Sequence, residues 1–203
     1  MKYLFFDLEC SNCFNKVGKI CEFGAVVTDE NFNIITGDFC NVELLSGSCD
    51  LIFSATAFHW LPFEEAVRRV KKALCPGGTF ALFWNHPFPN REDDPTNMAS
   101  RKVYDKYRPS SKKQVEFSED NLAVWKERLL NAGFDFVEAK LYRRKRVLTT
   151  DQYIGLLNTY SDHIVLPEET KRLFEREMRR SIDSVGGFIN IYDTVDLYMG
   201  TNR

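Results

Sequence analysis

Two acidic residues near the amino terminus have a spacing that could bind a metal ion. Asp7 and Glu9 lie two residues apart at the end of an apolar stretch, residues 3–8. In a β-strand, residues i and i+2 point to the same face, so the two carboxylates would lie side by side. Carboxylate oxygens are the usual ligands of Mg²⁺ in proteins. Asp7 and Glu9 are therefore a candidate metal site, and the alternative is that they are strand-end acids without a function.

A second candidate site follows two apolar stretches farther along the chain. The stretches at 49–56 and 79–83 each lead into aromatic and polar side chains. Ligands of open α/β sheets bind at the carboxyl ends of the strands. The candidate cofactor-binding or substrate-binding residues are Ala57, Phe58, His59, Trp60, Trp84 and Asn85. The alternative is that the aromatic residues belong to the core and that His59 is a hydrogen-bonded loop residue.

Hydrophobic periodicity predicts the elements that must position this second set. Residues 49–60 have the pattern of a buried strand that runs into a loop. Residues 63–74 have the apolar spacing of a helix, which Pro76-Gly77-Gly78 is expected to stop. With a second strand at 79–85, the segment has the size of a βαβ unit.

The remaining chain predicts further helices and strands in alternation. A helix is expected at 119–133, with Gly133 past its end and with Leu122, Trp125, Leu129 and Leu130 directed inward. A strand at 134–147, a helical segment at 151–184 and a strand at 188–199 are expected to follow.

The amino-terminal segment resembles a nuclease family. The sequences FFDLE and ICEFGAVVTDENFN predict a three-stranded meander and resemble the first strands of the DEDD-type 3'-5' exonucleases, whose fold is related to ribonuclease H. In that family an Asp-x-Glu pair binds two magnesium ions, a role that the resemblance gives to Asp7 and Glu9. The family also has an aspartate on a later helix, with a His or Tyr base a few residues before it. Tyr192 and Asp196 have this spacing, but they lie in a strand-like stretch and so do not match the family's pattern. A metal-dependent exonuclease-like protein is thus one alternative function.

The rest of the chain resembles a different family. The sequence DLIFS at 50–54, the sequence LCPGGTFAL at 74–82, and the FHW and WN that follow resemble class I S-adenosylmethionine-dependent methyltransferases of the trans-aconitate methyltransferase-like branch. The resemblance implies a Rossmann-like sheet, S-adenosylmethionine as cofactor and methyl transfer to a small-molecule substrate. It also implies a glycine-rich turn after the first strand and an acid after the second. Neither is found here, so we expect no tight cofactor binding and an impaired activity.

The two resemblances together predict an α/β fold. An incomplete Rossmann-like methyltransferase sheet with helices, residues 44–203, would follow a three-stranded antiparallel ribonuclease H-like meander, residues 1–43, in one globular unit. The strands could form a single sheet in the order 3-2-1-4-5-7-6, or the fourth strand could pair antiparallel to the third. The seven residues between Val42 and Asp50 reach roughly 25 Å when extended, too short for a covering helix. An open sheet face would favour a homodimer, and an inactive fusion or binding module is the third candidate function.

Composition limits the remaining possibilities. The chain has 203 residues, 44% of them hydrophobic, and a formal net charge of -2, which indicates one globular domain. Without a long apolar stretch or a secretory signal, a cytoplasmic location away from membranes is expected. The acidic net charge argues against nucleic-acid binding, and the basic run at 143–146 is expected to be a solvated strand end. Buried thiols are favoured over a zinc site formed by Cys10, Cys13, Cys21 and Cys40.

Overall fold

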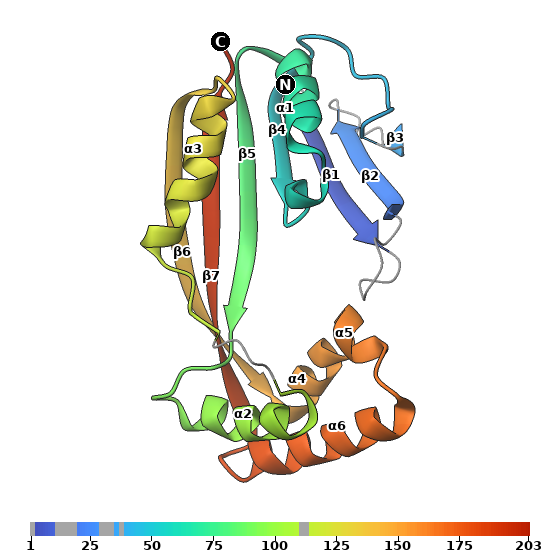
Figure 1. The fold of residues 1–203 in the computed structure, drawn as a ribbon, viewed down its shortest axis with the longest axis vertical. Helices are drawn as coiled ribbons and strands as arrows, with labels where there is room; N and C mark the ends of the chain where they lie inside the picture. Colours follow the sequence, from blue (N-terminus) through green and yellow to red (C-terminus); the bar gives the residue numbers. More distant parts are fainter. Residues whose placement is uncertain (1–2, 11–19, 29–34, 37–38, 110–113) are drawn as a thin grey trace.

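The computed structural model describes residues 3–10, 20–28, 35–36, 39–109 and 114–203 (Figure 1). Within these residues the strands form one seven-stranded sheet in the order β3-β2-β1-β4-β5-β7-β6. The strands are β1 (Tyr3–Cys10), β2 (Ile20–Thr28), β3 (Ile35–Thr36), β4 (Cys49–Ala55), β5 (Leu74–Phe88), β6 (Asp135–Thr149) and β7 (Phe188–Thr201). The α-helices are α1 (Phe63–Ala73), α2 (Pro95–Tyr107), α3 (Ala123–Asn131), α4 (Thr150–Leu157), α5 (Ser161–Ile164) and α6 (Glu168–Asp183). Two short 3-10 helices are η1 (Phe58–Trp60) and η2 (Glu119–Leu122).

The order of the strands decides between the two arrangements of the join. β4 pairs parallel to β1, with Phe5 opposite Phe53, and parallel to β5. The single-sheet order predicted from the sequence is confirmed, and the alternative in which the fourth strand pairs antiparallel to the third is wrong. β2 is antiparallel to both β1 and β3. Antiparallel pairing of three strands does not by itself define a ribonuclease H fold. The described residues therefore do not show the predicted ribonuclease H-like meander.

The segment before β4 contains no helix over residues 39–48, as its short reach predicts. It runs instead along the end of α1, where the Gly47 and Ser48 amides donate to the carbonyls of Lys72 and Ala73, each at 2.9 Å. These bonds satisfy carbonyls that a helix end leaves without intrahelical partners.

The βαβ unit forms as predicted, with shifted boundaries. α1 buries Ala66, Val67, Val70 and Ala73 on one face. It ends before Leu74, which is already the first residue of β5, so Pro76-Gly77-Gly78 lies inside the strand and is not the helix stop. β5 is also longer than expected, because its pairing with β7 continues to Phe88 opposite Tyr192.

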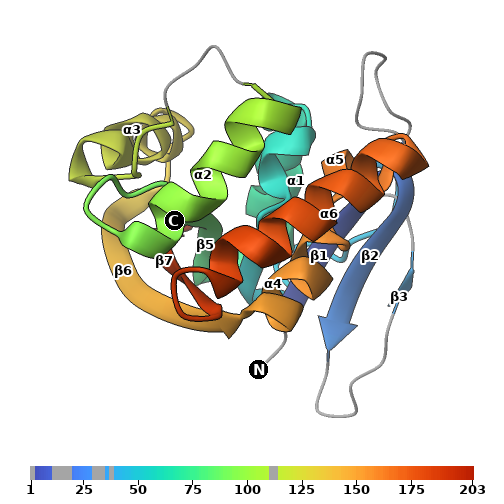
Figure 2. The ribbon, with the colours of Figure 1, turned by 90° about the horizontal axis from the view of Figure 1, so that it is seen from below.

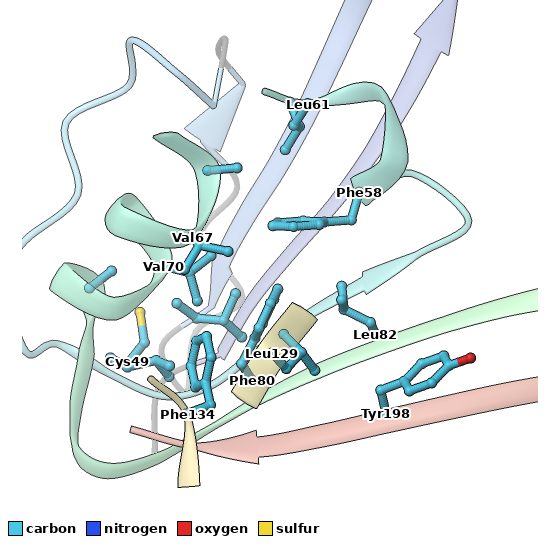
Figure 3. Close-up of a cluster of buried hydrophobic side chains, with 14 of the residues drawn as sticks. Cys49, Phe58, Leu61, Val67, Val70, Phe80, Leu82, Leu129, Phe134 and Tyr198 are labelled. Atoms are coloured by element: carbon cyan, nitrogen blue, oxygen red, sulfur yellow. The ribbon is translucent and has the colours of Figure 1, made fainter. Parts of the chain in front are cut away.

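The main core lies between the sheet and the helices α1 and α3, which cover the same face in both views (Figures 1 and 2). The side chains of Phe80, Leu82, Leu129, Phe134 and Tyr198 meet there, each at most 2% exposed (Figure 3). Burying a large apolar side chain contributes roughly 1.5–3 kcal/mol. The prediction that Leu130 points inward is wrong, because its side chain is 47% exposed. Gly133 follows the helix with φ +79°, which is the left-handed C-cap expected there.

A second group of helices packs at the far end of the long strands. α2, α4, α5 and α6 lie together beyond the ends of β5, β6 and β7 (Figures 1 and 2). Their shared core contains Phe174, Met178, Ile182, Ile189 and Ile191. The predicted helical segment at 151–184 is thus confirmed as three helices, and none of the helices in the described residues is long and apolar enough to span a membrane.

The face of the sheet opposite α1 is less well covered. Leu51, Phe53 and Phe83 point to that face and are half-buried. The rings of Phe53 and Phe83 lie 5.8 Å apart. In the described residues, α1 and α3 lie on the other face, whereas α2, α4 and α5 meet β5 at its carboxyl end.

Candidate functional site

The loop after β4 places a short aromatic segment against the middle of β5, beside Phe83 and Trp84. Thr56 has a φ of 53°, which is uncommon for a β-branched residue, and its N–H donates to the carbonyl of Phe83 at 2.8 Å. The chain turns at this point and forms η1, which contains Phe58, His59 and Trp60. A strained turn at the end of a parallel strand is a common location for functional residues.

His59 and Trp84 form the polar contact of this site. The Nε1–H of Trp84 donates to Nδ1 of His59 at 2.9 Å, so the proton of the neutral His59 ring is on Nε2. Burial lowers the pKa of His59, which favours this neutral form. Trp84 is 7% exposed and stacks on Trp125, with ring centroids 4.7 Å apart. The indole is therefore fixed by packing on one side and by a hydrogen bond at its edge.

The structure divides the other predicted residues among different environments. Ala57 and Phe58 are each 1% exposed, and Phe58 packs against Phe80 in the core (Figure 3). Trp60 is 52% exposed, with its ring 4.9 Å from that of His59. Asn85 lies on the opposite face from Trp84, because consecutive strand residues alternate. Its side-chain amide donates to Asp193 at 3.4 Å.

A second histidine, missed by the sequence analysis, lies two residues beyond Trp84 on the same face. Nε2 of His86 is 3.1 Å from Oδ1 of Asp196, a distance typical of an ion pair, although the angle is not that of a hydrogen bond. Asp196 is 1% exposed and accepts hydrogen bonds from the Trp84 amide and the Tyr198 hydroxyl, each at 2.9 Å. The sequence feature that could have indicated this contact is Asp196, an acid within an apolar, strand-like stretch. The sequence analysis considered Asp196 only for its spacing from Tyr192.

Tyr192 and Asp196 do not meet. Both lie on β7, where four residues span roughly 13 Å. The hydroxyl of Tyr192 donates to Asp94 at 2.7 Å. The sequence predicted that Tyr192 and Asp196 lie in a strand, and the structure confirms this prediction.

Asp193 neutralises part of the basic run on β6. The Arg146 Nη2 donates to Asp193 Oδ1 at 2.9 Å, and the Arg144 Nε donates to Oδ2 at 3.1 Å. Burial alone would raise the pKa of Asp193, but the hydrogen bonds from the two arginines lower it. The prediction that the run is only solvated is therefore wrong for Arg146, which is 26% exposed and paired with a buried carboxylate.

A cavity of about 260 Å³ lies where α2, α4 and α5 meet the end of β5. The Tyr104 hydroxyl is 3.2 Å from Nε2 of His163, and Arg108 pairs with Asp162 at 2.6 Å. Burial raises the pKa of Tyr104 to about 12, so its phenol stays protonated. Hydrogen-bonding groups and an apolar wall thus meet in one pocket, as in small-molecule sites. The lining includes Pro87, Arg101, Tyr153, Leu157, Tyr160 and Ile191.

No metal site emerges from the part of the chain that the structure describes, where no group of three His, Cys, Asp or Glu side chains could hold a metal ion. The side chains of Asp7, Glu9, Cys10 and Cys21 lie outside the described set, and Cys13 lies in a segment that is not described. Cys49 is buried, and Cys40 and Cys75 are half-buried.

Comparison with known proteins finds similarity to methyltransferases. A sequence model of the methyltransferase domain matches residues 16–82, a range that crosses the expected boundary at residue 43. An uncharacterized methyltransferase-like protein of Schizosaccharomyces pombe is 28% identical over 163 residues, which are 75% of this chain and 60% of that protein. An uncharacterized methyltransferase of the same yeast is 25% identical over 158 residues, 76% of this chain and 58% of that protein. The chain thus spans about 60% of the length of these relatives.

The fold agrees with the sequence matches. The solved structure of an inferred type II methyltransferase from Anaeromyxobacter dehalogenans aligns with a TM-score of 0.55 and 16% identity, over 81% of this chain and 69% of that one. The chain is therefore similar in sequence to methyltransferases, and it has an α/β fold like that of the solved structure. The comparisons give no support to the exonuclease-like resemblance of the amino terminus.

Proposed function

We propose that this chain keeps the substrate side of a class I methyltransferase and lacks a tight site for S-adenosylmethionine. The family activity is methyl transfer from that cofactor to a small molecule. The unit β4-α1-β5, the β6–β7 pair and the sequence similarity support the first part of the proposal. The orientation of β2 supports the second.

The fit of the cofactor can be judged from the backbone. Class I folds hold the adenosine between a glycine-rich turn after the first strand and an acid after the second, and parallel strands bring both to one edge of the sheet. Here β2 runs antiparallel, so its last residue, Thr28, lies opposite Tyr3 at the start of β1. The chain also has no glycine between Asp7 and Val17. The described residues do not fit the adenosine, and the methyltransferase activity of the chain alone would be impaired.

The substrate would bind at the cavity between α2, α4 and α5. The apolar wall and the phenols of Tyr104, Tyr153 and Tyr160 suit a small organic molecule. A binding protein without turnover is the second candidate, since this cavity does not depend on the amino-terminal strands.

Calorimetry with S-adenosylmethionine tests the proposal. We expect no saturable heat at cofactor concentrations near 10 μM, because neither the turn nor the acid can contact the adenosine. A dissociation constant at or below about 10 μM would show that the chain has a working cofactor site. A titration of heat-unfolded protein under the same conditions gives the heat of dilution and of nonspecific binding.

A further inference from the structure

The charged side chains of the cavity between α2, α4 and α5 neutralise one another. Among the described lining residues, the arginines and acids are Arg101, Arg108, Asp105 and Asp162. Nη2 of Arg108 lies 2.6 Å from Oδ2 of Asp162, and Nε of Arg101 lies 3.8 Å from Oδ2 of Asp105. Each acid is thus matched by an arginine, so these side chains offer an ionised ligand no charge that lacks a partner.

The other titratable groups of the cavity are uncharged at neutral pH. Burial raises the pKa of Tyr104 to about 12, and it also raises the pKa values of Tyr153 and Tyr160. Burial lowers the pKa of His163, whose Nε2 lies 3.2 Å from the Tyr104 hydroxyl. The described lining is therefore polar in places but electrically neutral.

One wall of the cavity is apolar and fully packed. Tyr153, Leu157 and Ile191 belong to it, and each is 2% exposed. The lining also includes the half-buried Tyr160 and the exposed Asp105, so the cavity reaches the surface and a small molecule can enter. Its volume of about 260 Å³ lies just below the roughly 300 Å³ at which pockets for drug-sized ligands begin. The ligand is therefore a smaller molecule.

Tyr160 supplies the hydroxyl that is available to such a ligand. The side-chain amide of Asn90 donates to Gln114, and the Tyr104 hydroxyl is within hydrogen-bond distance of His163. The Tyr160 hydroxyl forms no hydrogen bond with another residue that the structure describes. A phenol can both donate and accept a hydrogen bond, so Tyr160 can bind a polar group of either kind.

We propose that this cavity binds an uncharged molecule with an apolar body and one polar group, which forms a hydrogen bond with the Tyr160 hydroxyl. The inference rests on the proposed function, because it names the class of substrate for the same cavity. An alcohol or an amide meets these conditions. A carboxylate, a phosphate or an ammonium ion would lose its hydration and would need a charged partner, which Arg108 and Asp162 already are to each other.

Three probes of similar shape test the charge of the ligand: benzyl alcohol, benzoate and benzylammonium. Binding at neutral pH is followed by NMR through the ring signals of His163, and the signals of His59, outside the cavity, should not move. We expect the dissociation constant of benzyl alcohol to be at least about tenfold lower than those of the two ions, because an ion loses hydration without gaining a partner.

The possible failures of this titration differ from that of the cofactor titration. Tighter binding of either ion would overturn the inference but leave the cavity as the substrate site. No response of His163 to any probe would overturn both the inference and the placement of the substrate there. The probes do not involve S-adenosylmethionine, so the predicted lack of a cofactor site stands or falls separately.

Asp162→Asn tests the charge pairing directly. The variant leaves Arg108 without its carboxylate partner, so benzoate should bind about tenfold more tightly than to the unmodified chain. Asp151→Asn is the matched control, because Asp151 pairs with Arg179 outside the cavity, and it should leave benzoate binding unchanged. Equal binding of benzoate to Asp162→Asn and to the unmodified chain would contradict the inference.

Tyr160→Phe tests the hydrogen bond to the ligand. Loss of one neutral hydrogen bond should weaken the binding of benzyl alcohol about fivefold. Tyr142→Phe changes a tyrosine on β6 that is 54% exposed and lies outside the cavity, so it should have no effect. Unchanged binding in Tyr160→Phe would contradict the role of this hydroxyl. If a variant fails to fold, the order of the three probes on the unmodified chain still decides the charge of the ligand.

Discussion

Three buried or partly buried residues, Trp84, Asp196 and Asp193, determine the chemistry on the two faces of β5 and β7. Trp84 bonds to His59 through its ring and to Asp196 through its backbone. Asp193 points to the other face and pairs with Arg144 and Arg146. The two acids are three residues apart on one strand, so they serve different faces and cannot form one site.

Asp193→Asn tests how much the buried ion pair contributes. Removing one partner of a buried pair leaves an uncompensated charge, and we expect unfolding by urea to show a loss of about 3–5 kcal/mol at neutral pH. Arg144→Gln should cost less than about 1 kcal/mol, because Arg144 is 66% exposed. A loss in Asp193→Asn no larger than that in Arg144→Gln would contradict the assignment of Arg146 as the buried partner.

The same substitution predicts a change in acid stability. The pKa of Asp193 is lowered in the folded chain, so its contribution is complete above its unfolded value of about 4 and is lost as the pH falls through the folded value. Asp193→Asn should therefore flatten the decline in stability below about pH 4. An unchanged decline in the variant would show that Asp193 is not the group responsible.

At the scale of elements, the sequence predicted segments whose periodicity comes from a single buried face. α1 buries Ala66, Val67, Val70 and Ala73, and this spacing is visible without the structure. α3 was placed within one turn, but Leu130 was assigned to the wrong side because an apolar residue can also lie at the surface.

The helix α2 was not predicted, because its buried face includes the polar residues Thr96, Asn97 and Ser100 and so lacks a clear apolar periodicity. Asp94 accepts from the Thr96 amide at 2.8 Å, a local cap, and also from Asn190 and Tyr192 on β7, each at 2.7 Å. Burial alone would raise the pKa of Asp94, but these hydrogen bonds lower it to about 2. His86 and Asp196 were missed for a different reason, since their contact joins two strands that pair only in the folded chain.

At the scale of the whole molecule, the half-buried face of β4 and β5 gives a prediction about assembly. Leu51, Phe53 and Phe83 form an apolar surface opposite α1, and such surfaces favour association. We expect light scattering to show dimers or larger species, and Phe53→Lys to shift the population toward the 23.6 kDa monomer. Leu45→Lys is the control, because Leu45 is an exposed loop residue. A monomeric unmodified chain would show that this face is stable in water.

The central claim is that β2 runs antiparallel to β1, because this orientation removes the acid of the cofactor site from the correct edge of the sheet. NMR measures it directly through contacts between Hα protons on the two strands. Antiparallel strands bring these protons together at alternate pairs, as in the register that places Phe5 opposite Val26 and Asp7 opposite Gly24. We predict such Hα–Hα contacts along one alternating set of these pairs. Their absence, with contacts that instead fit a parallel second strand, would contradict the account.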